Sequence, residues 1–323
     1  MEILKKVSAI LRDKDNFLIV GHSRPDGDCI GSQTSLYFLL KNMGKNVYML
    51  NYGPILAHYN FVPGIDEMKP FVPENAKIDY SIFVDCGDLE RVDDNFQPVG
   101  YVINIDHHLT NVKYGDLNYI DKYTSSVGEL IYNIAYELNQ KITPEIATCI
   151  YLSIMADTGS FKFSNTTPRT FRIAAELQEA GADISHIAQE FWENMSKKSM
   201  IVKAYTLDNL NFMYEDMVCW VEFPKNVYDS LELELEEPEN LANMLRSIRG
   251  VELSILFREK NINDVRVGFR SKGKINVSQV AGNIGGGGHA RAAGATLRTS
   301  LEEAKETVFN ELAKYVGDLV PAK

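Results

Sequence analysis

The sequence lacks any run of apolar residues close to the roughly 18 that cross a bilayer, so we expect no membrane association. It has only four cysteines, at positions 29, 86, 149 and 219, and no CxxC pair. This scarcity argues against a disulfide framework and disfavours a structural zinc site, and it indicates reduced thiols. The N-terminal segment lacks the continuous apolar core and cleavage site of a signal peptide. We therefore expect a cytoplasmic protein.

The sequence also lacks an excess of basic residues. It contains 33 Lys and Arg against 44 Asp and Glu, which gives a net charge of −11. Proteins that hold extended nucleic acid neutralise many phosphates with basic side chains. The charge therefore argues against long duplex nucleic acid as a partner, while a local site for a short anionic ligand stays compatible with it.

The length of 323 residues predicts about two domains. In the first half, short apolar runs at 17–20, 46–50, 80–84 and 101–105 alternate with helical patterns, the first of them at 29–43. Further helical patterns follow at 124–139, 143–157, 167–180 and 183–210. This alternation predicts an α/β fold with a mainly parallel sheet and flanking helices.

The rest of the chain predicts a smaller α/β domain. Strand-like runs occupy 217–223, 251–257 and 264–269, and helical patterns occupy 276–284 and 300–315. The acidic run at 231–237 indicates an exposed surface. We expect a metal-binding catalytic domain at 1–190, a helical connector at 191–211 and a substrate-binding domain at 212–323.

Four predicted elements of the first half end in residues that can bind a metal ion. Because ligands bind beyond the carboxyl ends of parallel strands, these residues should converge. They are His22, Asp26 and Asp28 after 17–20, Asp85 after 80–84, Asp106, His107 and His108 after 101–105, and Asp157 at the end of 143–157. Each Asp taken alone could be an ordinary loop residue or helix cap.

Carboxylates and imidazoles are ligands for Mn²⁺, Mg²⁺, Fe²⁺ or Co²⁺. Even two of these three histidines and four of these five aspartates exceed what one ion with open positions needs. They suffice for two ions that share a carboxylate, about 3.5–4 Å apart, as in enzymes that activate water against a phosphate.

The motifs His22-x-x-Pro25-Asp26-Gly27-Asp28, Asp85, Asp106-His107-His108 and Asp157 occur in the order of, and resemble, those of the DHH phosphoesterases. The segment GGGGHARAAG at 285–294 resembles the signature of the domain associated with that family. The resemblance spans nearly the whole chain. At this length, the chain most resembles the bacterial nanoRNase and 3′-phosphoadenosine-5′-phosphate phosphatase group.

The resemblance implies two divalent ions, most often Mn²⁺, with Mg²⁺ and Co²⁺ as alternatives. The ligands of the first would be His22, Asp26 and Asp85; those of the second would be Asp28, Asp85, His107 and Asp157. Asp106 would orient a histidine, and His108 would reach the scissile phosphate as a hydrogen-bond donor or general acid.

A basic segment contrasts with the acidic chain. Residues 241–300 contain ten Lys and Arg and three acids, a net charge of +7. The four glycines at 285–288 could be a flexible linker, or could let the backbone approach an anion. The resemblance implies that Arg270, Ser271 and His289, with Gly287 and Gly288, hold the non-scissile phosphate.

These features predict a two-metal phosphohydrolase, with short oligonucleotides or 3′-phosphoadenosine 5′-phosphate as substrates. A phosphodiesterase for cyclic di-AMP or linear pApA is the near alternative. An inorganic pyrophosphatase, a processive single-strand exonuclease and a non-catalytic nucleotide-binding module fit the sequence less well. The oligomeric state is left open, with a homodimer as one option.

Overall fold

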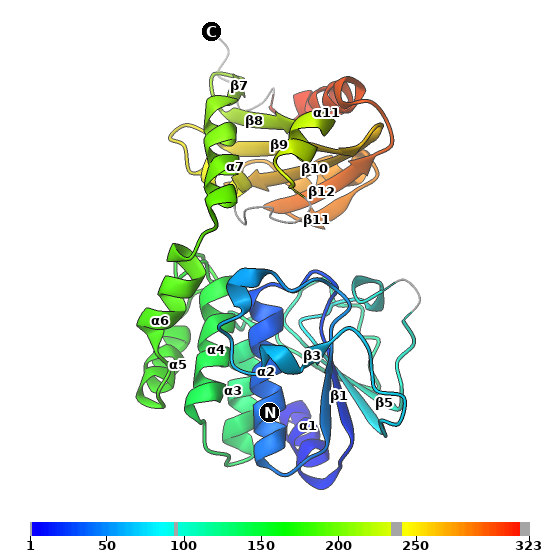
Figure 1. Cartoon of the computed structure of the whole chain (residues 1–323), viewed down its shortest axis with the longest axis vertical. Coiled ribbons are helices and arrows are strands. Elements are labelled where there is room, and N and C mark those ends of the chain that lie inside the picture. The colour runs from blue at the N-terminus through cyan, green and yellow to red at the C-terminus, as the bar shows by residue number, and fades with distance from the viewer. Residues whose placement is uncertain (1, 94–95, 234–240, 317–323) are drawn as a thin grey trace. The chain divides into compact units, whose positions relative to one another are not determined.

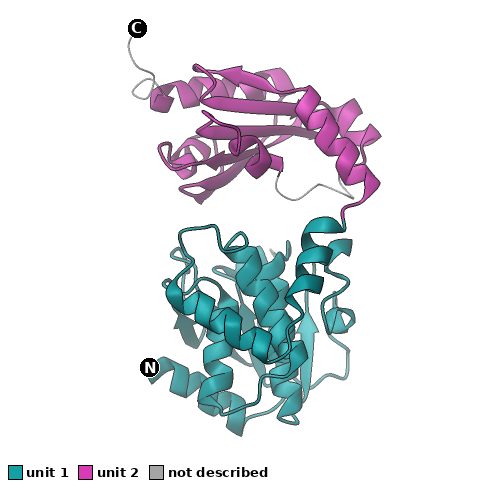
Figure 2. Ribbon diagram, turned by 90° about the vertical axis from the view of Figure 1, so that its left-hand side faces the viewer, with its two compact units in different colours: residues 1–194 teal, residues 195–323 magenta. Residues whose placement is uncertain are grey.

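The computed structural model describes residues 2–93, 96–233 and 241–316. The chain divides into two compact units, residues 1–194 and 195–323 (Figure 2). The predicted connector at 191–211 spans this boundary, and its helix α7 (Lys197–Asp208) falls in the second unit. Within the described residues, no helix is both long and apolar enough to span a membrane.

The first unit is built on a six-stranded parallel sheet in the order β3-β2-β1-β4-β5-β6. The strands are β1 (Phe17–Val20), β2 (Val47–Leu50), β3 (Met68–Lys69), β4 (Tyr80–Val84), β5 (Tyr101–Asp106) and β6 (Leu117–Ile120). The helices are α1 (Glu2–Asp13), α2 (Gly27–Asn42), α3 (Val127–Glu137), α4 (Pro144–Asp157), α5 (Pro168–Glu179) and α6 (Ile184–Ala188). The expected α/β fold with a parallel sheet is confirmed.

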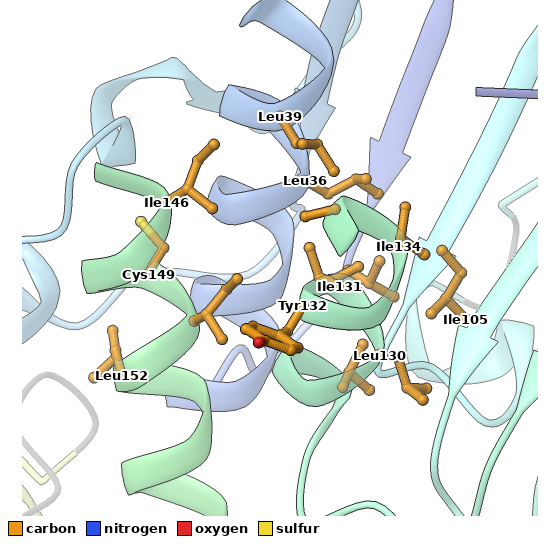
Figure 3. Packing of buried hydrophobic residues seen from close by; sticks show 14 of the residues in the cluster. Leu36, Leu39, Ile105, Leu130, Ile131, Tyr132, Ile134, Ile146, Cys149 and Leu152 are labelled. Atoms are coloured by element: carbon orange, nitrogen blue, oxygen red, sulfur yellow. The ribbon is translucent and has the colours of Figure 1, made fainter. Parts of the chain in front are cut away.

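Both faces of the sheet are buried, which is why the strands read as continuous apolar runs. Phe17 and Ile19 of β1 belong to the main core with helices α1 to α4, whereas Leu18 and Val20 belong to a smaller cluster on the opposite face. Figure 1 shows α2, α3 and α4 beside the sheet, and Figure 3 shows their apolar side chains interleaved. The helices thereby fix where the strand ends lie.

The helical pattern at 183–210 is not one helix. It comprises α6, a π-helical turn (Gln189–Glu193) and α7, which begins at a cap where the Ser196 hydroxyl accepts a hydrogen bond from the Ser199 amide. The apolar residues keep a helical spacing across residues 194–196, so their pattern does not show that the helix is interrupted there.

The second unit contains a six-stranded sheet in the order β11-β12-β10-β9-β8-β7, in which only β8 and β9 pair in parallel. The strands are β7 (Asn211–Met213), β8 (Val218–Phe223), β9 (Leu253–Asn261), β10 (Asp264–Ser271), β11 (Gly287–His289) and β12 (Ala292–Leu297). The further helices are α8 (Lys225–Ser230), α9 (Leu241–Arg246), α10 (Val277–Asn283) and α11 (Leu301–Val316). The predicted strands match β8, β9 and β10.

Two features of this unit differ from the sequence expectation. Gly287 and Gly288 lie in the edge strand β11 rather than in a loop, because their partners on β12 are also small: Gly294 and Ala293. Of the acidic run at 231–237, residues 234–237 lie outside the described residues, and Leu233 is buried.

Candidate metal centre

The candidate residues of the first unit meet where the strand order reverses. The chain runs from β1 outward through β2 and β3, then returns to pair β4 with the other side of β1. Ligands of open α/β sheets bind at the carboxyl ends of the strands beside such a reversal. Each of the eight predicted residues has a side-chain atom within 4.0 Å of another: His22, Asp26, Asp28, Asp85, Asp106, His107, His108 and Asp157.

Asp85 stands at the centre of this arrangement. Its Oδ2 lies 3.3 Å from His22 Nε2, and its Oδ1 lies 3.9 Å from His107 Nε2. Asp85 is buried, and its backbone adopts a left-handed conformation with φ of 54°. A non-glycine residue held in that region is often part of a functional site. The two carboxylate oxygens therefore face two different sets of donors.

The first set lies beside β1. His22 Nε2 is buried and has no hydrogen-bond partner among the described residues, and it lies 4.0 Å from Asp26 Oδ1. Cys29 is also near His22 and Asp85. Burial raises the pKa of the Cys29 thiol well above its ordinary value, which keeps it protonated and a poor ligand. An orphaned imidazole nitrogen facing carboxylates fits a bound cation.

The second set joins α2, β5 and α4. His107 Nε2 lies 3.5 Å from Asp28 Oδ2 and 3.7 Å from Asp157 Oδ2. The Nδ1 of His107 lies 3.5 Å from the carbonyl oxygen of Thr124, an arrangement that turns Nε2 toward the acids. These three residues, with Asp85, form the second donor set.

Several polar residues outside the set predicted from the sequence hold these acids in place. Ser32 and Ser153 donate hydrogen bonds to Asp28 Oδ1 at 3.0 and 2.6 Å, and Asn165 Nδ2 donates to Asp157 Oδ2 at 3.2 Å. Ser153 and Asp28 are 125 positions apart in the chain. No local sequence signal connects residues so far apart.

Asp106 and His108 form a pair beside the two donor sets. Asp106 Oδ1 lies 2.7 Å from His108 Nδ1, and Asp106 Oδ2 accepts a hydrogen bond from Asn111. Burial acts to raise the pKa of Asp106, but hydrogen bonds and charge from His108, together with Asn111, lower it to about 2. An ionised Asp106 therefore fixes the orientation of His108.

The remaining acids repel one another. Burial, then the charges of neighbouring aspartates, raise the pKa of Asp85 well above its ordinary value. Burial and Asp28 raise the pKa of Asp157 to about 7, and burial raises that of Asp28. A bound cation removes this repulsion and keeps the acids ionised. Oxygen and imidazole donors are those that Mn²⁺, Mg²⁺ and similar ions take.

The raised pKa values predict how stability depends on pH. An acid whose pKa is higher in the folded state contributes stability at low pH and loses it as pH rises through that value. Asp157 and His107, whose pKa is also raised, therefore make the metal-free protein less stable at pH 8 than at about pH 6.5. Burial lowers the pKa of His22 to about 4. This histidine therefore lowers the stability of the folded protein only when the pH falls below about 6.5.

Thermal unfolding in EDTA and in Mn²⁺ at both pH values tests this expectation. The metal-free first unit should melt several degrees lower at pH 8. Added Mn²⁺ should raise its melting temperature more at pH 8, because metal binding releases protons. A metal-free melting temperature that does not fall, or an equal Mn²⁺ effect at both pH values, would contradict the expectation.

The second unit places two of its predicted residues in one row. Arg270 on β10 is the register partner of Ala292 on β12, which is the partner of His289 on β11. Register partners point to the same face of a sheet, so Arg270 and His289 flank a small side chain. Ser271 is buried instead, and its hydroxyl donates to Glu252 Oε1 at 3.1 Å.

The glycines next to this row allow close backbone approach. A Cβ at Gly288, where φ is 139°, would lie 2.6 Å from the carbonyl oxygen of Ala292. A Cβ at Gly287 would meet nothing within 4 Å. Gly288 is therefore required for the pairing of β11 with β12, whereas Gly287 leaves an open, exposed backbone beside His289.

Comparison with known proteins identifies two family domains in the chain. The DHH family N-terminal domain matches residues 16–154, and the DHHA1 domain matches residues 226–318. The crystal structure of an exopolyphosphatase-related protein from Bacteroides fragilis shares the fold, with a TM-score of 0.91 and 24% identity over 98% of this chain and 97% of that one.

Two relatives from bacteria extend over nearly the whole chain. The bifunctional oligoribonuclease and PAP phosphatase NrnA of Thermus thermophilus is 30% identical over 95% of this chain and 93% of its own. The protein of the same name from Bacillus subtilis is 31% identical over 88% of this chain and 90% of its own. The chain therefore belongs to the DHH family of phosphoesterases and is a hydrolase.

Proposed function

We propose that this protein is a metal-dependent phosphohydrolase that cleaves short oligoribonucleotides and 3′-phosphoadenosine 5′-phosphate to mononucleotides. The observation that carries the proposal is the position of Asp85, whose two oxygens face two separate donor sets. A shared carboxylate of this kind is what a pair of divalent ions requires.

The residues present fit two divalent ions, with Mn²⁺ the preferred choice and Mg²⁺ or Co²⁺ as alternatives. His22 and Asp26 with Asp85 would hold one, and Asp28, His107 and Asp157 with Asp85 would hold the other. Bound there, the ions would supply Lewis-acid activation of water and neutralise charge on the phosphate.

The protein's own acid–base group in this proposal is His108. Its Nδ1 lies 2.7 Å from Asp106 Oδ1, so we assign to its Nε2 the hydrogen bond to the substrate phosphate or the protonation of the leaving oxygen. The ionised Asp106 carboxylate holds the ring of His108 in one orientation. Asn111 in turn holds Asp106.

The substrate class follows from charge and from the relatives. The basic segment at 241–300 has a net charge of +7 in a chain of −11, so anion binding is local rather than extended. In the second unit, Arg270 and His289 lie in one row of the sheet and can both donate hydrogen bonds to a phosphate. The two relatives described above are named as an oligoribonuclease and PAP phosphatase.

A substrate panel with purified protein and Mn²⁺ tests this proposal. The panel contains a 5′-phosphorylated RNA trinucleotide, 3′-phosphoadenosine 5′-phosphate, pApA, a 24-nucleotide RNA, cyclic di-AMP and pyrophosphate. We expect the trinucleotide and 3′-phosphoadenosine 5′-phosphate to be hydrolysed along with pApA, whereas a phosphodiesterase specific for dinucleotides would leave both intact, and we expect EDTA to abolish turnover. Faster hydrolysis of cyclic di-AMP, pyrophosphate or the long RNA would replace the proposed substrate class. Nucleotide binding without turnover would indicate a non-catalytic module.

A further inference from the structure

The connection between β6 and α3 contacts the second donor set through residues 124–127. The carbonyl oxygen of Thr124 lies 3.5 Å from His107 Nδ1. The carbonyl oxygen of Ser125 accepts a hydrogen bond from Asn165 Nδ2 at 2.9 Å, and the same nitrogen donates to the carboxylate that ends α4. Two members of the second donor set are therefore held by neighbouring backbone groups of one short segment.

The start of α3 holds the third member. Ser126 is the N-cap residue of α3, but its side chain makes no capping hydrogen bond and its Oγ lies 3.0 Å from Ser153 Oγ. The amide of Val127 donates to Asp28 Oδ2 at 3.0 Å, and the amide of Gly128 donates to Ser153 Oγ at 2.9 Å. A serine at this position usually accepts hydrogen bonds from such amides. The first turn of α3 instead directs its donors to Asp28 and to the serine that holds it.

A buried acid, Glu129, lies behind this segment in the first turn of α3. Its Oε1 accepts hydrogen bonds from the hydroxyl of Ser125 at 2.5 Å and from the hydroxyl of Thr170, in α5, at 2.7 Å. Its Oε2 lies 3.8 Å from Arg169 Nε. Burying a carboxyl group is costly unless its oxygens are hydrogen-bonded, so these partners account for its presence in the interior. Glu129 thereby joins the segment 124–127 to α5.

We propose that Glu129 is a positioning residue for the second donor set, which acts by accepting the hydrogen bond of Ser125 and so fixing residues 124–127. This inference rests on the proposed function, because it concerns the binding of the second of two divalent ions. Residues that orient the ligands of a metal ion strengthen its binding. Ligands that are already ordered lose less conformational freedom when the ion binds. Glu129 therefore raises the affinity of the second donor set without contacting the ion.

The first donor set is held by a different part of the unit. Asn51 Nδ2, just after β2, donates to the carbonyl oxygen of His22 at 3.2 Å. The amide of Ser23 donates to the carbonyl oxygen of Arg91 at 2.8 Å. Loss of the Glu129 contact should therefore weaken the binding of one ion and leave the other nearly unchanged. This selectivity separates a positioning role from a general contribution to folding.

Calorimetric titration of the metal-free full chain with Mn²⁺ tests this role. We expect Glu129→Ala and Ser125→Ala each to weaken one of two Mn²⁺ equivalents about 10- to 100-fold and to leave the other nearly unchanged. The double variant should lose no more than the larger single loss, because both changes remove the same contact. Glu129→Gln should keep most of the affinity, since its Oε1 can still accept both hydroxyl groups. Ser8→Ala, which changes a buried serine of α1, is the matched control and should bind Mn²⁺ like the wild type.

Two ligand variants identify the ion that is affected. Ser125→Ala should weaken the remaining equivalent in an Asp26→Asn background, which impairs the first donor set, and should have no effect in an Asp157→Asn background, which impairs the second. Equal weakening of both equivalents, no weakening, additive losses in the double variant, or an effect that persists in Asp157→Asn would overturn the role. Circular dichroism shows whether each variant folds. If Glu129→Ala does not, Ser125→Ala and its two backgrounds decide.

Hydrolysis of pApA by the wild type is measured separately, so that this inference and the proposed function fail in different ways. If the wild type hydrolyses pApA while Ser125→Ala leaves Mn²⁺ binding unchanged, only this inference fails. If the wild type binds two equivalents, one of them sensitive to Ser125→Ala, but hydrolyses no substrate of the panel, the positioning role stands and the proposed function fails.

Discussion

Replacing Asp85 by asparagine is expected to lower the hydrolysis of pApA in Mn²⁺ by at least about 1,000-fold, since it removes a carboxylate that faces both donor sets. Asparagine has nearly the same shape and tolerates the left-handed backbone at this position. The variant should therefore fold. Its loss of activity would reflect the missing charge.

Stability separates this effect from misfolding. In EDTA, Asp85→Asn should be at least as stable as the wild type, because burial and neighbouring acids raise the pKa of Asp85 and make a carboxyl group costly there. In Mn²⁺ it should gain less stability than the wild type. Asp66→Asn, which changes an exposed acid of the same unit, is the control and should leave activity unchanged. An Asp85→Asn enzyme with more than about a tenth of wild-type activity would refute the role of Asp85.

Replacing His108 by alanine is expected to lower kcat for the same substrate by about 100- to 10,000-fold while leaving Mn²⁺ affinity unchanged. The reason is that Asp106 engages His108 Nδ1 at 2.7 Å, so this nitrogen is not available to an ion. Asp106→Asn should produce a smaller loss, of about 10- to 100-fold, because it removes the charge that orients His108. Titration calorimetry with Mn²⁺ and steady-state kinetics give the two readouts.

This prediction also decides between two arrangements of the same atoms. Asp85, His107 and His108 are close enough to hold an ion among themselves, since His108 Nδ1 lies 3.5 Å from Asp85 Oδ1. If His108 is a ligand, His108→Ala will lose Mn²⁺ affinity along with activity. His186→Asn, on the exposed surface of α6, is the control for loss of a histidine.

The sequence allowed much of the first unit to be predicted for a physical reason. Strands buried on both faces, such as β1 and β4, are short and mostly apolar, and the residues after them converge because parallel strands end at one edge. The strand β6 was missed because its sequence, LNYI, mixes polar and apolar residues. The strand β12 was missed because its residues are mostly alanine and glycine, which seldom form strands.

The supporting residues of the site could not be predicted from the sequence. Ser153 lies in α4 and donates a hydrogen bond to Asp28, and Asn165, which follows α4 in the chain, donates one to Asp157. Both contacts depend on how the helices pack against one another. The left-handed backbone conformation of Asp85 could not be predicted, because a glycine usually marks such a conformation and this position is an aspartate.

Electron paramagnetic resonance of the protein during titration with Mn²⁺ tests most directly whether two ions share Asp85. The shared carboxylate predicts that a spin-coupled pair forms as the second equivalent binds, and that Asp85→Asn shows only isolated ions. A wild-type spectrum of one ion per chain, or of two uncoupled ions, or a coupled signal that persists in Asp85→Asn, would contradict it.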